Sequence, residues 1–222
     1  MKSSDLIKHL TESGLMPKEE MLEVAKSDQK LFIGIPKETA LQENRVALVP
    51  DSVGLLVNNG HRVVIESNSG DAANFTDKDY SEAGAEIVFD SKEVYKANII
   101  IKVAPPTLNE IELLNANQKQ ILFSALQISS QPKDCIKELM KKKVTGIAYD
   151  FIKDREGVYP IVRSMSEIAG NTSILIAAEL LSNANGGHGV MMGGIPGVKP
   201  TEVVILGSGG VGEFAARAAL GL

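Results

Sequence analysis

The sequence predicts an α/β fold in which a mainly parallel sheet is followed by the beginning of a second domain of the same kind. From residue 31 to residue 149, short apolar runs alternate with helix-like stretches, which is the pattern of repeated β–α–β units. Near the end of the chain, an apolar run at residues 202–206 leads into a glycine-rich turn and an alanine-rich helix start. Both observations are typical of Rossmann-like domains.

The predicted strands are short and apolar. Ile99, Ile100 and Ile101 form a continuous apolar run, as expected for a parallel strand that is buried on both faces. The strand-like runs lie at residues 31–35, 62–66, 86–89, 98–103, 120–126 and 144–149. The helix-like stretches between them lie at residues 50–59, 77–83, 92–96, 108–114 and 133–142.

Local signals place several helix boundaries. Thr107 and Glu110 have the spacing of a capping box, in which the two side chains satisfy free N–H groups at the start of a helix. Gly60 and Gly84 follow helix-like stretches, where glycine commonly ends a helix. These signals support the alternation of strands and helices.

The chain divides into three predicted parts. Residues 1–30 form a helical extension with amphipathic patterns at 5–10 and 17–25, which either packs on a neighbouring subunit or is mobile. Residues 31–164 form the N-terminal domain. Residues 165–222 supply a linker helix, predicted at 166–183, and the truncated start of the second domain. The Gly/Pro-rich loop at 185–200 is either rigidly packed or a mobile loop near a cleft.

Composition excludes several classes of protein. The net charge of −5, from 28 acidic and 23 basic residues, argues against a nucleic-acid or membrane-surface partner. Cys135 is the only cysteine, so the chain has no intrachain disulfide and no cysteine-based metal cluster. Its amphipathic surroundings predict a half-buried structural thiol. The sequence lacks a secretory signal and a long apolar span, so we expect a cytoplasmic protein.

The glycine-rich turn has the form G-x-G-x-x-G. In such a turn one glycine makes the tight bend, one lets the backbone approach a pyrophosphate, and one lets helix and strand pack closely. The free N–H groups of the helix then face the anion. Because Leu222 comes before the acidic residue expected about 20 residues past the glycines, we expect the front part of a larger enzyme. The predicted cofactor-binding residues are Gly207, Gly209, Gly210, Val211 and Gly212.

Further segments resemble one family. Residues 33–39 and 43–50 resemble the N-terminal signature of alanine dehydrogenases, which also occurs in the α subunit of proton-translocating transhydrogenase. Residues 60–63, the Tyr-x-x-Ala-Gly-Ala pattern at 80–85, and the blocks at 165–170 and 192–198 are similar to the same family. The last two blocks look more like alanine dehydrogenase than like transhydrogenase.

The resemblance implies a function and a set of site residues. It implies NAD-dependent oxidation of L-alanine, a small amino-acid substrate, to pyruvate and ammonia by a homo-oligomer, a hexamer in the family. Arg45 matches the family's carboxylate-binding arginine, a role that suits a planar, two-pronged donor. Ser166 matches a residue that touches the cofactor, although a helix-capping serine would look the same. The sequence leaves NAD and NADP undistinguished.

Two positions depart from the family pattern. The family's substrate-binding lysine corresponds to Ala104, and its catalytic histidine corresponds to Gln127, which cannot act as an acid or base near neutral pH. Lys102 lies two residues from the lysine position, on the same face of a strand, and is our candidate substitute for substrate binding. Neither His61, predicted to be structural, nor His188 falls at the histidine position.

Three functions therefore stay open. The first is an alanine dehydrogenase-type enzyme, with its own or an altered substrate. The second is a transhydrogenase-like subunit that passes hydride to another nucleotide-binding subunit and needs neither the lysine nor the histidine. The third is a catalytically silent relative that senses a nucleotide or a metabolite. The family's aspartate acid–base residue would lie beyond Leu222.

Overall fold

The computed structural model describes residues 30–199 and 201–222. The helical patterns that we predict at residues 5–10 and 17–25 lie outside the described residues. Backbone contacts divide the chain into Met1–Lys30 and Leu31–Leu222. The second of these units holds all the elements described below.

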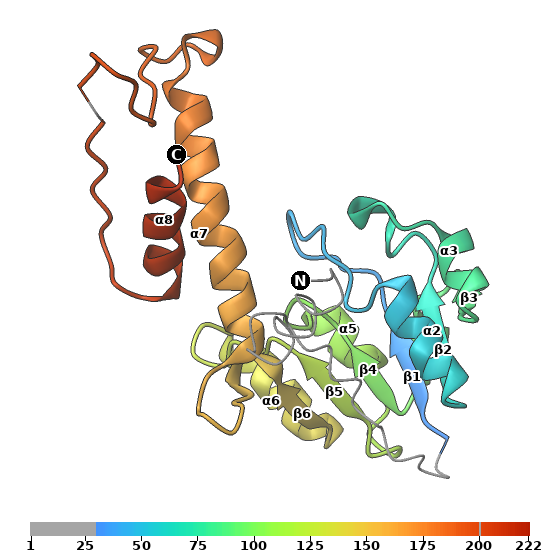
Figure 1. Cartoon of the computed structure of the whole chain (residues 1–222). Helices are drawn as coiled ribbons and strands as arrows, with labels where there is room; N and C mark the ends of the chain where they lie inside the picture. The colour runs from blue at the N-terminus through green and yellow to red at the C-terminus, as the bar shows by residue number, and fades with distance from the viewer. Residues whose placement is uncertain (1–29, 200) are drawn as a thin grey trace, which may run out of the picture. The chain divides into compact units, whose positions relative to one another are not determined.

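One parallel sheet of six strands organises the N-terminal domain (Figure 1). The strand order is β3-β2-β1-β4-β5-β6, and every neighbouring pair is parallel. The order reverses between β1 and β4, the kind of point at which open α/β sheets bind ligands beyond the carboxyl ends of their strands. The strands are β1 (Phe32–Ile35), β2 (Arg62–Glu66), β3 (Glu86–Val88), β4 (Ile99–Ile101), β5 (Ile121–Ser124) and β6 (Thr145–Ala148).

A helix follows each of the first five strands, so the predicted alternation is confirmed. The capping box at the start of α5 is present, because the Thr107 N–H donates to Glu110 Oε2 at 2.7 Å and the threonine hydroxyl accepts from the Glu110 N–H. Gly60 and Gly84 have positive φ angles of 87° and 92° just after helix ends, as C-terminal glycines often do. The helices are α2 (Pro50–Asn58), α3 (Asp77–Glu82), α4 (Ser91–Val94), α5 (Leu108–Leu113) and α6 (Lys133–Lys142), with a short 3₁₀ turn η1 (Asp71–Ala73) before α3.

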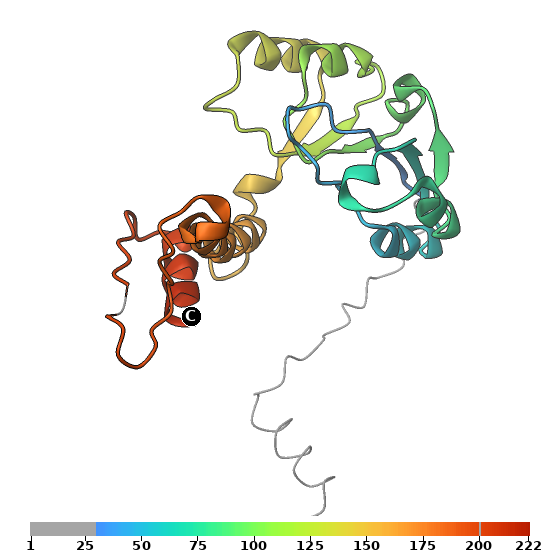
Figure 2. The same cartoon turned by 90° about the horizontal axis from the view of Figure 1, so that it is seen from above.

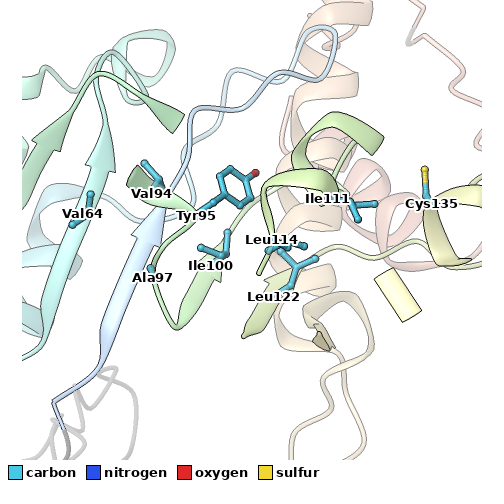
Figure 3. Close-up of a cluster of buried hydrophobic side chains, with 9 residues drawn as sticks. All are labelled: Val64, Val94, Tyr95, Ala97, Ile100, Ile111, Leu114, Leu122 and Cys135. Atoms are coloured by element: carbon cyan, nitrogen blue, oxygen red, sulfur yellow. The ribbon is translucent and has the colours of Figure 1, made fainter. Parts of the chain in front are cut away.

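The sheet has a hydrophobic core on each face. Successive strand residues point to opposite faces, and Ile100 accordingly packs in one core while Ile99 and Ile101 pack against the other. Cys135 on α6 is 7% exposed and belongs to the core shown in Figure 3. It is a structural thiol, as predicted, but it is buried rather than half-buried. The Figure 3 core consists of Val64, Val94, Tyr95, Ala97, Ile100, Ile111, Leu114, Leu122 and Cys135.

The long helix α7 (Pro160–Leu181) begins six residues before its predicted start. Pro160 occupies the first turn, where the missing N–H of proline costs nothing. The 3₁₀ turns η2 (Tyr149–Phe151) and η3 (Asn183–Asn185) flank it in sequence. The following loop starts against the end of α7, since the Gly189 N–H donates to the Leu181 carbonyl at 2.9 Å.

The strand predicted at residues 202–206 is wrong for this structure. These residues form no ladder with any described strand, and Leu206 is 95% exposed. An apolar run becomes a strand only where a neighbour accepts and donates its backbone hydrogen bonds. The predicted helix does form, as α8 (Gly210–Leu220), and it packs along α7 in both views (Figures 1 and 2).

Candidate functional site

A cavity of about 210 Å³ lies beside the carboxyl ends of β4 and β5. The loop after β1, the strand ends, η2 and the first turns of α7 all contribute to its wall. Because these segments are far apart in sequence, only the parallel sheet brings them together. The lining residues are Arg45, Val46, Ala47, Ile101, Lys102, Val103, Phe123, Tyr149, Ile161 and Met165.

Arg45 brings a positive charge to this mostly apolar wall, and Glu43 holds its guanidinium. Nε donates to Glu43 Oε1 at 2.8 Å and Nη2 donates to Oε2 at 2.6 Å, which makes a two-pronged pair. The hydrogen bond from Arg45 holds the pKa of the Glu43 carboxyl below its usual range, although burial opposes this. The third nitrogen, Nη1, lies 3.3 Å from Met165 Sδ.

Lys102 lies in the same wall, but its ammonium faces two carboxylates. Its side chain is 1% exposed, and Nζ donates to Glu110 Oε1 at 2.8 Å and to Glu38 Oε2 at 3.0 Å. Glu38 also accepts the N–H groups of Val103 at 2.6 Å and Ala104 at 3.3 Å. This buried network joins the loop after β1 to the loop after β4. The substrate-binding role that we predict for Lys102 stays a prediction.

Tyr149 closes the cavity from η2. Its hydroxyl donates to the Val103 carbonyl at 2.6 Å, and its ring lies 5.8 Å from the Phe123 ring, centroid to centroid. Burial raises the pKa of the Tyr149 hydroxyl, partly opposed by the charge of Arg45. The hydroxyl is therefore protonated near neutral pH and serves as a donor that orders the end of β4.

The two departures from the family pattern have different surroundings. Ala104 is 7% exposed and directs its N–H to Glu38. Gln127 follows β5 in an exposed turn with a φ of 42°, and its carbonyl accepts the Ser130 N–H at 2.9 Å. Neither residue lines the cavity.

The glycine-rich turn at the start of α8 shows why glycine is needed at two of its positions. Gly207 has a φ of 116°, a conformation that L-residues with side chains rarely adopt. A Cβ on Gly212 would lie 2.3 Å from the Gly207 carbonyl oxygen, so a larger residue would open the turn. A Cβ on Gly209 would meet no atom within 4 Å. The backbone at Gly209 is thus accessible.

Ser166 lies inside α7, so its interpretation as a helix cap is wrong. Its hydroxyl donates to the Val162 carbonyl at 2.9 Å, and a Cβ on Gly210 would lie 3.1 Å from the serine Cβ. The serine therefore lies beside the first turn of α8. Gly170, one turn further along α7, faces Val211 so closely that a Cβ there would lie 2.6 Å from its carbonyl oxygen.

The two described histidines lie outside the cavity wall. His61 Nδ1 accepts the Leu31 N–H at 3.3 Å just before β2, which is a structural contact. His188 is exposed in the loop after α7.

Sequence reasoning missed Glu38, Glu43 and Tyr149, and it assigned Glu110 only to helix capping. Glu38 and Glu43 lie in the same two segments that carry the family resemblance. Their position in the segment that follows the predicted strand at residues 31–35 was the available signal. Their partners were not visible, since Glu38 and Lys102 are 64 residues apart in the chain.

Comparison with known proteins gives concordant matches. Residues 34–169 match the family described as alanine dehydrogenase/PNT, N-terminal domain, and residues 173–222 match the corresponding C-terminal domain. An alanine dehydrogenase from Methanococcus maripaludis is 45% identical over 193 residues, covering 86% of this chain and 51% of that protein. One from Staphylococcus epidermidis is 42% identical over 190 residues, with 86% and 50% covered.

Solved structures resemble the fold as well. A structure of L-alanine dehydrogenase has a TM-score of 0.78 at 41% identity and covers 85% of this chain and 52% of that one. A transhydrogenase from Sinorhizobium meliloti has a TM-score of 0.69 at 23% identity, with 85% and 53% covered, which indicates a shared fold. The chain thus spans about half the length of the relatives that it matches. Within the described residues, no helix is long and apolar enough to cross a membrane.

Proposed function

The chain belongs to the alanine dehydrogenase/PNT family, and from that premise we propose that it is the front part of an NAD-dependent alanine dehydrogenase. The reaction is the oxidation of L-alanine to pyruvate and ammonia. The observation that carries this proposal is the cavity in which a single well-anchored arginine, Arg45, borders an apolar space at the carboxyl ends of parallel strands.

The cavity suits a small acid with one carboxylate. Arg45 offers a two-pronged donor for it, and its 54% exposed side chain is accessible. Ile101, Phe123 and Met165 give the rest of the wall an apolar surface that fits a methyl group. Lys102 adds positive charge from beneath, but two carboxylates already neutralise it.

The turn at the start of α8 fits the pyrophosphate of NAD. Gly209 is the N-cap of α8 and provides no side-chain cap, so the first N–H groups of this helix are available for an anion. The open backbone at Gly209 leaves space for phosphate oxygens. When bound, NAD would supply the hydride acceptor of the reaction. We propose that Gly207, Gly209, Gly210, Val211 and Gly212 hold this cofactor, with Ser166 beside them.

The departures Ala104 and Gln127 favour a second candidate. Where the family pattern has a substrate lysine and a catalytic histidine, this chain has a methyl group and an amide, neither of which transfers protons near pH 7. A transhydrogenase-like subunit, which passes hydride between nucleotides, needs neither group. A silent relative that senses nucleotide or metabolite also needs neither.

Further properties are proposed on family grounds. We propose a cytoplasmic homo-oligomer, a hexamer, with a substrate domain at residues 31–164 and the start of the NAD-binding domain at 165–222. The two family matches divide the chain close to that boundary, at residues 169 and 173.

An NAD-reduction assay tests these proposals. The full-length protein is supplied with NAD and a panel of L-amino acids, and NADH is followed by absorbance. Alanine-dependent NADH formation supports the alanine dehydrogenase. The transhydrogenase-like function would instead be supported by two results together. The protein would turn over no amino acid, and it would transfer hydride from NADH to an NADP analogue in the presence of a nucleotide-binding subunit.

A further inference from the structure

The Arg45 guanidinium has two edges, and they have different partners. The side edge, formed by Nε and Nη2, is taken by the two oxygens of Glu43. At the outer end, formed by Nη1 and Nη2, Nη1 lies 3.3 Å from Sδ of Met165, and both residues line the cavity. A thioether sulfur is a weak acceptor. A carboxylate that reaches this outer end therefore gains a strong hydrogen bond in exchange for a weak one.

Glu43 is the better anchored member of the pair. Its side chain is 12% exposed, against 54% for Arg45. Its Oε1 also accepts the Arg45 backbone N–H at 3.1 Å, so the carboxylate has three hydrogen bonds to one residue. Displacing Glu43 would leave a largely buried carboxylate without these donors, which is unfavourable. An incoming carboxylate therefore does not compete for the side edge.

We propose that Glu43 is a positioning residue, which fixes the Arg45 guanidinium so that its outer end faces the cavity and receives the substrate carboxylate. This inference rests on the proposed function and deepens it. A free arginine side chain has many rotamers, and ordering it costs conformational entropy. Glu43 orders it before the substrate arrives, so less of that cost falls on binding.

The electrostatic surroundings agree with this role. The hydrogen bond from Arg45 keeps the pKa of Glu43 lowered, so the carboxylate is charged throughout the range in which an alanine-oxidising enzyme would work. Among the described residues, the Glu43 carboxylate accepts hydrogen bonds from Arg45 alone, and Glu43 does not line the cavity. It therefore acts through Arg45.

The first test is Glu43→Gln in the full-length protein. The amide keeps the shape but loses the charge, and its NH2 group donates rather than accepts, so it cannot receive both Nε and Nη2 of Arg45 on separate atoms. We expect the KM for L-alanine to rise about tenfold with kcat changed less than about twofold, since the contact serves binding in the ground state and the transition state alike. A KM that stays the same or falls would overturn the inference, because a competitor of the substrate would behave in that way.

The chain offers a matched control. Arg62 and Glu86 form the same two-pronged pair on the surface, with Nε–Oε1 at 2.8 Å and Nη2–Oε2 at 2.7 Å and about half of each side chain exposed. Glu86→Gln should leave KM unchanged. A rise equal to that of Glu43→Gln would show that loss of any such pair disturbs the protein, and would overturn the inference.

A double-mutant cycle separates positioning from general structure. Glu43→Gln made in an Arg45→Lys background should add little to the KM, because the group that Glu43 orients is already gone. If the fold-changes in KM caused by the two substitutions simply multiplied, Glu43 would not act through Arg45. Should Glu43→Gln fail to fold, Glu43→Asp, which retains the charge one methylene further back, replaces it in the cycle with the same expectation.

Failure of the inference and failure of the proposed function give different results. Unmodified protein that neither oxidises alanine nor binds pyruvate in calorimetry would refute both. Unmodified protein with alanine turnover and a Glu43→Gln variant of unchanged KM would refute the inference alone.

Discussion

Replacing Lys102 by methionine should destabilise the protein severely. The substitution keeps most of the side-chain volume but removes the ammonium that two buried carboxylates share. Each carboxylate has an oxygen within 3.0 Å of that nitrogen, so these oxygens lie at most about 6 Å apart once it is gone. At an effective dielectric constant of about 20, two like charges at that distance repel by about 3 kcal/mol. Loss of one member of a buried pair typically costs about 3–5 kcal/mol in total.

Urea denaturation followed by circular dichroism measures this cost. With a denaturant slope of about 2 kcal/mol per molar urea, the midpoint should fall by about 1.5–2.5 M. Lys96→Met is the matched control, because Lys96 pairs with Glu93 on the surface, with more than half of each side chain exposed. Such a pair contributes about 0.5 kcal/mol or less. A Lys102→Met variant within about 1 kcal/mol of the unmodified protein would refute the view that this network is a buried charge balance.

Four further predictions concern the site. Arg45→Lys in the full-length enzyme should raise the KM for the substrate strongly, because a two-pronged contact to its carboxylate becomes a point charge. Unchanged steady-state kinetics would show that Arg45 is a surface residue with no role in substrate binding. If Ala104 and Gln127 mark lost alanine chemistry, as in the second candidate function, Ala104→Lys combined with Gln127→His should raise alanine-dependent NADH formation, by up to about 10²–10⁴-fold for a positioned acid–base group; robust turnover by the unmodified enzyme would contradict that condition and support the alanine dehydrogenase. Residues 1–222 alone should bind NAD weakly or undetectably in calorimetry, and micromolar affinity would show that further strands are not needed. Ionised Glu43 should stabilise the fold at pH values above its ordinary pKa of 4.5, and this contribution should be lost as the pH falls through the lowered pKa of the folded state. The unfolding free energies of the unmodified protein and of Glu43→Gln should therefore converge in acid. A difference between them that widens in acid would be inconsistent with the lowered pKa.

Local pattern was enough to predict the sheet. The run Ile99–Ile101 is short, continuous and apolar, as expected for a strand buried on both faces, and it alternates with helix-like stretches as its neighbours do. The spacing of Thr107 and Glu110 predicted a capping box because both members of that motif lie in one turn. Features of this kind depend on residues a few positions apart, and the sequence displays them directly.

Features that depend on distant partners were not predictable in the same way. The apolar run at residues 202–206 has the composition of a strand, but a ladder also requires a neighbouring strand. Glu38 accepts a hydrogen bond from Lys102, which lies 64 positions away in the chain, and no short-range sequence pattern links the two residues. Ser166 looked like a helix cap because serine favours that position, whereas Pro160 starts the helix earlier. The resemblance to a family predicted a site role for Arg45 but did not indicate Glu43, the carboxylate that holds its guanidinium.

The close approach of α7 and α8 at Gly170 has a mechanical consequence. Met165 and Ser166 are consecutive residues of α7, yet Met165 touches the Arg45 guanidinium and Ser166 lies against the glycine-rich turn. Because nothing larger than a hydrogen atom fits on Gly170 beside α8, any side chain at this position would push α8 away from α7. The glycine-rich turn at the start of α8 would then leave its place beside Ser166, although no residue of that turn had been changed.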